Sequence, residues 1–224
     1  YELGVRLVGS EMCIRDRCFS TMDNSFLSMK RGYIEVICGC MYSGKTEELI
    51  RQIKRCEYAK QTYRVFKPKV DNRYSDDDVT SHNQDSVNAI AIEDIYDIYQ
   101  HIQHDTQVVG IDEAQFFNND ILNVTQKLAK SGRRVIIAGL DTDWQGKPFG
   151  PMPQLLSTAD IVKKQYAICM TCGESATRTQ RLVANDDEVL IGSFNMYEAR
   201  CRHHFDPHLS SKKETTNIHE LRPT

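Results

Sequence analysis

The sequence predicts an α/β fold in which helices cover a parallel β-sheet. Short β-branched apolar runs alternate with amphipathic stretches at helical spacing through residues 32–140. Such alternation is typical of strands joined by helical crossovers, and strands joined in this way pair in parallel. The chain has 224 residues, which is long enough for one α/β domain and a small appendage.

The first half of the chain alternates clearly. Residues 33–38 form a β-branched run between two glycines and predict a strand. Residues 45–60 place apolar side chains on one helical face and charged side chains on the other. Residues 63–67 predict a second strand, which Pro68 stops. The polar stretch 71–88 is expected to be a loop.

The same alternation continues further along. Residues 93–104 carry apolar side chains at helical spacing, and residues 108–111 form a short apolar run that predicts a buried strand. Apolar side chains recur at helical spacing through 121–129, and residues 134–140 predict a further strand. We expect these elements to form one sheet domain at residues 29–165.

Composition excludes several classes of protein. Hydrophobic residues make up 40% and charged residues 26%, which is ordinary globular usage and not that of a disordered or fibrous chain. The formal net charge is −3, so no global positive field would attract nucleic acid. Because no run approaches 18 consecutive apolar residues, we expect no membrane span.

The two ends of the chain and its cysteines need separate expectations. Residues 1–28 show no periodicity, and we expect them to be a non-native or disordered leader outside the fold. Residues 206–224 are expected to be a polar tail. The eight cysteines are unevenly spaced and include a C-x-x-C pair, which favours a reducing compartment and a metal site over a disulfide framework.

A phosphate-binding motif lies between the first predicted strand and helix. The segment GCMYSGKT matches G-x-x-x-x-G-K-[ST], in which glycines let backbone N–H groups face an anion at a helix N-terminus. We expect Lys45 to reach the terminal phosphates and the Thr46 hydroxyl to bind Mg²⁺. The expected phosphate-binding residues are Gly39, Cys40, Met41, Tyr42, Ser43, Gly44, Lys45 and Thr46.

Two carboxylates follow the predicted strand at 108–111. Asp112 stands where a strand end would deliver a Mg²⁺ ligand beside the phosphates, because ligands sit at the carboxyl edge of open α/β sheets. Glu113 could orient water in an ATPase or take the proton of an acceptor hydroxyl in a small-molecule kinase. The residues themselves leave these two roles open.

A cysteine–histidine pattern marks a second unit, which we place at residues 166–205. Cys169 and Cys172 form one C-x₂-C pair, and Cys201 and His204 form a C-x₂-H pair after 28 intervening residues. Four such ligands suit a closed, tetrahedral, structural Zn²⁺ site. His203 remains an alternative to His204 as the fourth ligand.

Several motifs in order resemble one family. GCMYSGKT, KVDNRY, IDEAQFF, LDTDWQGKPFG and IGSFNMYEARC, with the Cys/His pairs, closely resemble the cytosolic, zinc-containing thymidine kinases of bacteria, poxviruses and animal cells, over residues 32–205. The resemblance implies a parallel-sheet P-loop NTPase (RecA-like) domain and a small zinc-binding domain that carries a lasso loop. It also implies γ-phosphoryl transfer from ATP, with Mg²⁺, to the 5′-hydroxyl of thymidine for DNA synthesis. A cytoplasmic homotetramer inhibited by thymidine triphosphate (dTTP) is implied as well.

The resemblance also assigns roles to individual residues. Glu113 would be the catalytic base, Asp112 the Mg²⁺ ligand, and Gln115 part of the same nucleotide-binding element. Asp71 and Arg73 would lie near the nucleotide. The thymidine-binding residues would be Met41, Phe116, Leu140, Trp144 and Phe149, together with the lasso residues Glu188, Val189, Leu190, Ile191 and Gly192, and Tyr197.

Three qualifications belong to these assignments. Leu140, Phe116 and Phe149 would, without the resemblance, be read as core residues. Trp144 stands where a smaller aromatic residue is expected, and His204 stands where animal forms have cysteine.

The alternative function is a DNA-linked ATPase with a structural zinc finger, and a third reading is a non-catalytic nucleotide-binding module. The net charge of −3 disfavours the ATPase, and the complete set of site residues disfavours the module. We further expect that loss of zinc would free the lasso loop and leave the phosphate loop untouched, because the loop lies in the other domain.

Overall fold

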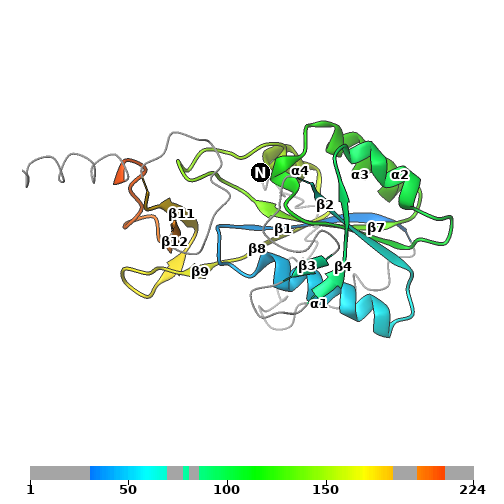
Figure 1. The fold of residues 1–224 in the computed structure, drawn as a ribbon, viewed down its shortest axis with the longest axis horizontal. Helices are drawn as coiled ribbons and strands as arrows, with labels where there is room; N and C mark the ends of the chain where they lie inside the picture. Colours follow the sequence, from blue (N-terminus) through cyan, green and yellow to red (C-terminus); the bar gives the residue numbers. More distant parts are fainter. Residues whose placement is uncertain (1–30, 70–77, 81–85, 184–195, 210–224) are drawn as a thin grey trace, which may run out of the picture. The chain divides into compact units, whose positions relative to one another are not determined.

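The computed structural model describes residues 31–69, 78–80, 86–183 and 196–209. Its main feature is a six-stranded sheet of order β5-β2-β6-β7-β1-β8, in which every neighbouring pair is parallel (Figure 1). The strands are β1 (Tyr33–Gly39), β2 (Tyr63–Pro68), β5 (Ile90–Ile92), β6 (Val108–Ile111), β7 (Arg134–Leu140) and β8 (Ile161–Lys164). This confirms the predicted parallel α/β fold.

Helices cover both faces of this sheet. They are α1 (Lys45–Tyr58), α2 (Ile98–His101), α3 (Asp120–Lys130) and α4 (Met152–Thr158), with 3₁₀ turns η2 (Ile95–Asp97) and η3 (Ala114–Phe116). Helix α1 lies on one face, and α2, α3 and α4 lie on the other (Figure 1). No helix in the described parts of the chain is both long and apolar enough to cross a membrane.

The interior strand β1, which lies between β7 and β8, shows why the sheet needs two helical layers. All seven of its residues are buried. Successive side chains of a strand point to opposite faces, so Val36 packs in the cluster with α3 and α4 whereas Ile37 packs in the cluster with α1. A continuous apolar run is therefore the expected signature of this strand.

Two expected elements differ from the structure. The segment 71–88, expected to be a loop, contains the antiparallel strands β3 (Asp78–Thr80) and β4 (Ser86–Asn88). Val87 of β4 is buried in the cluster that contains α1, so a single apolar side chain gives this polar segment a place to pack. The helix expected at 93–104 is shorter and consists only of η2 and α2. It ends because the backbone of Ile102 is extended and the N–H of Gln103 donates to the hydroxyl of Thr106.

Short antiparallel strands follow the sheet. Strand β9 (Ala167–Ile168) pairs with β10 (Ser175–Ala176), and β11 (Arg178–Arg181) pairs with β12 (Tyr197–Arg200). The buried alanine and cysteine residues of this region form a small core that also includes Cys40, from the segment between β1 and α1. They are Ala167, Cys169, Ala176, Ala199 and Cys201. We call the described residues 167–181 and 196–204 the Cys/His unit.

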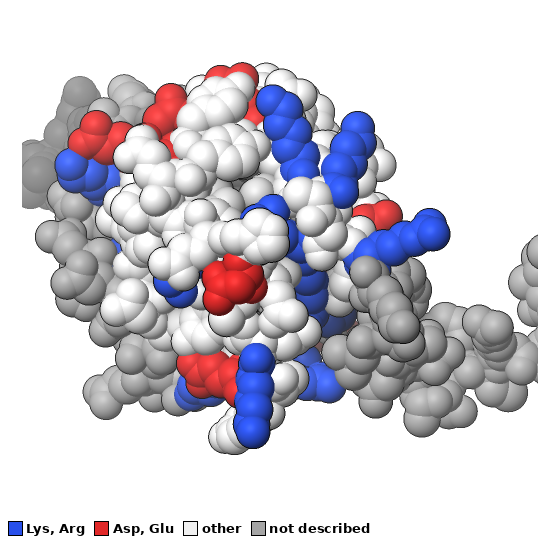
Figure 2. Space-filling view, turned by 90° about the vertical axis from the view of Figure 1, so that its right-hand side faces the viewer, with Lys and Arg blue, Asp and Glu red and all other residues white. Residues whose placement is uncertain are grey.

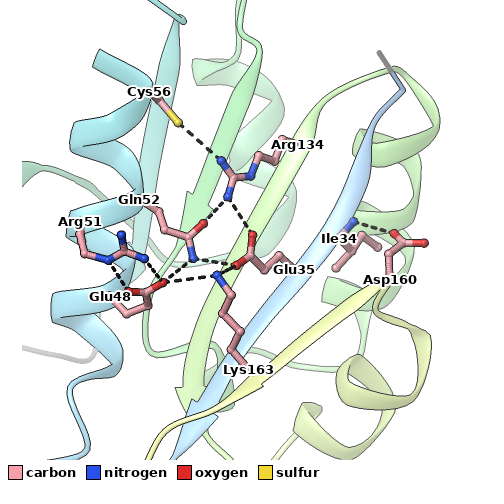
Figure 3. Close-up of polar contacts among 9 residues, drawn as sticks. All are labelled: Ile34, Glu35, Glu48, Arg51, Gln52, Cys56, Arg134, Asp160 and Lys163. Atoms are coloured by element: carbon pink, nitrogen blue, oxygen red, sulfur yellow. Dashed lines mark hydrogen bonds and ion pairs between the residues drawn. The ribbon is translucent and has the colours of Figure 1, made fainter. Parts of the chain in front are cut away.

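A charged residue lies in the middle of the apolar strand β1. Glu35 is 1% exposed and forms ion pairs with Arg134 of β7 at 2.8 Å and Lys163 of β8 at 2.7 Å. Gln52 of α1 donates a hydrogen bond to the same carboxylate at 2.7 Å (Figure 3). Burial alone would raise the pKa of Glu35, but hydrogen bonds from these three residues outweigh it and lower that pKa. The network joins three strands and a helix.

Replacing Arg134 by methionine should destabilise the protein strongly. Arg134→Met leaves the buried Glu35 with one cation, Lys163, so we expect a loss of about 3 kcal/mol, the lower end of the usual penalty for breaking a buried pair. Urea unfolding measures this loss. Lys69→Met breaks an ion pair with Glu93 whose side chains are 64% and 72% exposed, and should lower the stability by no more than about 1 kcal/mol. Equal losses in the two variants would contradict the structural role of the network.

Candidate active site

Glycines fix the shape of the loop at residues 39–46, between β1 and α1. Gly39 has φ of 150°, and a Cβ there would lie 2.5 Å from the carbonyl oxygen of Gln165. Gly44, which precedes α1, has φ of 81°, and Tyr42 also adopts a left-handed conformation with φ of 63°. Left-handed residues in such a loop turn backbone N–H groups toward a common concavity, which suits an anion at the start of a helix.

The first two residues of α1 point to the chemistry of the loop. The ammonium of Lys45 is buried and donates to the carbonyl oxygen of Cys40 at 2.9 Å, so it lies across the loop. The hydroxyl of Thr46 donates to Oδ2 of Asp112 at 3.2 Å. Asp112 follows β6, which is separated from β1 only by β7. The two side chains expected to hold Mg²⁺ are therefore in contact at the carboxyl edge of the sheet.

Asp112 is electrostatically unusual. Its side chain is buried, and burial, together with the adjacent charge of Glu113, raises its pKa from 3.8 to about 7. A hydrogen bond from the backbone of Glu113, the charge of Lys45 and the hydroxyl of Thr46 act in the opposite direction but do not prevail. A buried carboxyl group whose pKa is raised is stabilised in its charged form by a nearby cation, which makes Asp112 a suitable ligand for a divalent ion.

Glu113 is held in position by its own backbone and by Gln115. Its φ of 50° and ψ of 41° are left-handed, a conformation that is uncommon outside glycine and often found at functional sites. The amide of Gln115 donates to the Glu113 carboxylate, and its oxygen accepts the N–H of Leu140 at 2.9 Å. Gln115 is 3% exposed and thereby ties the Glu113 carboxylate to the end of β7.

An aromatic pair stands next to these carboxylates. The rings of Phe116 and Phe149 meet edge to face, with centroids 5.7 Å apart. Both rings are only half-buried, as is Leu140, whereas the next residue, Phe117, lies in the core. Gly150 allows the close approach of the two segments, because a Cβ there would lie 2.3 Å from the carbonyl oxygen of Gln115. The partly exposed aromatic faces could contact a planar ligand.

Arg181 is a buried residue that the sequence did not single out, and it contacts two residues expected at the nucleoside site. It is fully buried, and its guanidinium lies 4.5 Å from the ring of Trp144 and 5.8 Å from the ring of Tyr197. Trp144 and Tyr197 were both expected at the nucleoside site, and the arginine brings them together by stacking. In the sequence, Arg181 follows polar neighbours and resembles a solvated surface residue, so only the unexpected tryptophan could have drawn attention to it.

The four expected metal ligands gather at one point. The ligand atoms of Cys169, Cys172, Cys201 and His204 all lie within 4.8 Å of one another. The sulfur atoms of Cys172 and Cys201 are 3.9 Å apart, and Nδ1 of His204 is 3.3 Å from the Cys201 sulfur. Ligands of a tetrahedral Zn²⁺ are about 3.6–3.8 Å apart, so this group could hold such an ion. Among the described residues, His203 does not belong to the group.

The thiol of Cys169 has a lowered pKa, which favours metal binding. Burial would raise its pKa, but backbone hydrogen bonds from Cys201, Thr171 and Cys172 outweigh burial and lower it to about 5. Since the thiolate is the form that binds metals, these N–H groups favour the ligating state at neutral pH.

Some expected site residues cannot be placed. Asp71, Arg73 and the lasso residues 188–192 lie outside the described residues, as do the leader at 1–28 and residues 210–224 of the tail.

The fold and the phosphate loop together define a P-loop nucleotide-binding protein of the α/β class. A strand, a glycine loop and a helix carry Lys45 and Thr46, and the end of a neighbouring strand supplies Asp112. Comparison with known proteins is more specific. Residues 32–205 match the family described as thymidine kinase. The thymidine kinase of Bdellovibrio bacteriovorus is 51% identical over 181 residues, which cover 81% of this chain and 89% of that protein. The chain belongs to the thymidine kinase family.

Replacing Asp112 by asparagine should stabilise the ligand-free protein while impairing its activity. Because the pKa of Asp112 is about 7 when folded and ordinarily 3.8, the penalty for burying its charge grows as pH rises between these values and stays constant above them. The thermal midpoint of Asp112→Asn should therefore exceed that of the wild type at pH 8, and the gap should narrow toward pH 5.

The control is Asp105→Asn, the same change at an exposed aspartate, which should show no such gap. Mg²⁺-dependent turnover should fall in Asp112→Asn only. A midpoint for Asp112→Asn below that of the wild type at pH 8 would contradict the raised pKa.

Proposed function

We propose that this chain transfers the γ-phosphoryl group of ATP to the 5′-hydroxyl of thymidine, giving thymidine monophosphate. Membership of the thymidine kinase family supports the substrates and the reaction. The structural observation that carries the proposal is the pair of adjacent carboxylates at one sheet edge, where Asp112 contacts Thr46 and Gln115 restrains Glu113. A kinase needs these two functions side by side, one group for the metal and one for the acceptor proton.

Residues 39–46 would bind the phosphates of ATP. The backbone N–H groups of the loop would hold the phosphate oxygens, and Lys45 would exchange its hydrogen bond with Cys40 for one with the terminal phosphates. The Thr46 hydroxyl and the Asp112 carboxylate would hold Mg²⁺. When bound, this ion neutralises charge that develops on the transferred group.

Glu113 would act as the general base. Its carboxylate would accept the proton of the thymidine 5′-hydroxyl as the oxygen attacks the γ-phosphorus. Gln115 would orient that carboxylate, because its amide donates to Glu113 while its oxygen is held by Leu140. In this role Gln115 positions the base, which refines its expected place among the nucleotide-binding residues.

The nucleoside would bind against the half-buried apolar side chains near Glu113. Phe116 and Phe149 offer ring faces and edges to a flat base, and Arg181 keeps the rings of Trp144 and Tyr197 together. Met41 and Leu140 would complete the apolar wall. The family resemblance adds Asp71 and Arg73 near the nucleotide and residues 188–192 as a closing lasso.

The Cys/His unit would hold one structural Zn²⁺. Four protein ligands would complete the coordination sphere of the ion, so it would take no part in the reaction. Its role would be to stabilise the packing of the short strands β9–β12. The resemblance further supports a two-domain division at residue 165 and a cytoplasmic homotetramer inhibited by dTTP. These finer features are part of the proposal.

Net charge disfavours the alternative of a DNA-linked ATPase. On the face drawn in Figure 2, lysine and arginine side chains gather mainly on the right-hand half, and most aspartate and glutamate side chains lie to their left and at the top. With a net charge of −3, the chain lacks the electrostatic field that such enzymes use to hold DNA.

One assay separates these functions. Consumption of ATP is measured with the purified chain in the presence of thymidine, deoxycytidine or single-stranded DNA. We expect stoichiometric formation of thymidine monophosphate with thymidine and no stimulation by DNA. If single-stranded DNA stimulates ATP consumption and thymidine is not phosphorylated, the protein is a DNA-linked ATPase and not a thymidine kinase.

The same assay tests the base. Glu113→Gln keeps the shape of the side chain but cannot accept the hydroxyl proton, so kcat should fall by about 10²–10⁴-fold while ATP binding persists. Glu93→Gln, the same change at an exposed glutamate, should turn over normally. Normal turnover by Glu113→Gln would remove Glu113 from this role.

A pair of adjacent histidine variants tests the metal site. His204→Ala removes a member of the ligand group and should lower the zinc content well below one per chain. His203→Ala removes the neighbouring imidazole and should keep the full zinc content. Elemental analysis of the purified variants gives the answer, and loss of zinc in His203→Ala alone would reassign the ligand.

A further inference from the structure

Three consecutive residues of the phosphate loop contact the Cys/His unit. Cys40 is fully buried and packs in the same small core as two of the expected zinc ligands, Cys169 and Cys201. Tyr42 packs against the edge of that core. The core that surrounds the metal group is therefore built in part from the phosphate loop itself.

Hydrogen bonds strengthen this contact. The backbone N–H of Met41 donates to the hydroxyl of Thr179 in β11 at 3.0 Å. The hydroxyl of Tyr42 donates to the carbonyl oxygen of Tyr197 in β12 at 3.2 Å, and the thiol of Cys40 donates to the carbonyl oxygen of Ala176 in β10 at 3.4 Å. Each loop residue is thus bonded to a different strand of the unit.

We propose that the metal group, formed by Cys169, Cys172, Cys201 and His204, and the phosphate loop are energetically coupled. Zinc bound to the metal group raises the affinity of the loop for a nucleotide, and a nucleotide bound to the loop raises the affinity of the metal group for zinc. This inference rests on the proposed function, in which the loop binds nucleotide phosphates and the Cys/His group binds zinc. It differs from the expectation drawn from the sequence, where the loop was treated as independent of the metal. The contacts of Cys40, Met41 and Tyr42 do not fit that independence.

The conformation of the loop explains why such contacts matter. Tyr42 has φ of 63°, which is unfavourable for a residue other than glycine and persists only where surrounding structure enforces it. The bonds of Met41 and Tyr42 to β11 and β12 supply that enforcement next to Gly44 and Lys45. These strands are short, with four residues each, so a bound metal would contribute much of their order.

Coupling follows because the loop depends on the strands of the Cys/His unit for its conformation, and these strands depend on the metal for their order. Without metal, β10–β12 would restrain the loop less, and a nucleotide would have to order the loop as it binds. With metal, that ordering is already complete, so the nucleotide binds more tightly. By linkage, a bound nucleotide must then tighten the metal by the same factor.

Zinc affinity measured with and without nucleotide tests the coupling. The apparent affinity of the full-length protein for zinc is measured at equilibrium against a chromogenic chelator, with and without saturating Mg·ADP. A protein-free titration corrects for zinc bound by ADP. We expect Mg·ADP to raise the zinc affinity about five-fold or more. The affinity of the zinc-depleted protein for Mg·ADP should be lower by the same factor.

Two hydroxyl deletions identify the residues responsible. The double variant Tyr42→Phe with Thr179→Val removes the two hydroxyl groups that bond the loop to β11 and β12, and it should lose most of the coupling factor. The matched control combines Tyr58→Phe, at a tyrosine that is 88% exposed, with Thr177→Val, at a half-buried threonine outside these contacts. The control should keep the full factor. If the double variant fails to fold, Tyr42→Phe alone carries the test and should show a reduced factor.

The outcomes are distinct. A protein that binds neither zinc nor Mg·ADP overturns the proposed function and this inference together. A protein that binds both, with zinc affinity unchanged by Mg·ADP, overturns this inference and leaves the kinase assignment intact. An equal coupling factor in the double variant and in the control removes Tyr42 and Thr179 as the positioning residues.

Discussion

The close approach of Gly39 to the backbone of Gln165 is the constraint on which the site depends. A side chain at Gly39 would collide with that carbonyl oxygen at 2.5 Å, and the N–H of Gln165 donates to Cys38 at 2.7 Å. Gln165 follows the last strand of the sheet and precedes β9, so the phosphate loop begins where the sheet passes into the Cys/His unit. Sheet, loop and metal group therefore share one short stretch of backbone.

The candidate site contains residues in energetically unfavourable states, and contacts with the rest of the fold stabilise them. Asp112 is a buried carboxyl group with a raised pKa, and Glu113 and Tyr42 have left-handed backbones. Such features persist only when neighbouring groups over-determine them. Gln115 does so for Glu113, and Thr179 and Tyr197 do so for the loop. The Glu35 network joins β1, the strand that leads into the loop, to β7, β8 and α1.

Local patterns in the sequence predicted the features that local chemistry determines. The apolar run of β1, the glycines at 39 and 44 and the spacing of Cys169, Cys172, Cys201 and His204 each carry their own signature. Features that arise from tertiary packing were not predictable. Nothing local marks Phe116 as half-buried and Phe117 as core, Val87 as the anchor of a strand pair, or Arg181 as buried between two rings. The contacts of Cys40, Met41 and Tyr42 likewise join segments more than 130 residues apart.

The central claim is that one loop, held between the sheet and the Cys/His unit, binds the phosphates of ATP. A crystal structure of the full chain with Mg·ADP and thymidine, recorded at the zinc absorption edge, tests this most directly. The account predicts phosphate oxygens within hydrogen-bonding distance of the backbone N–H groups of residues 39–46 and an anomalous peak among Cys169, Cys172, Cys201 and His204. Phosphates bound away from this loop, or a zinc peak elsewhere, would contradict it.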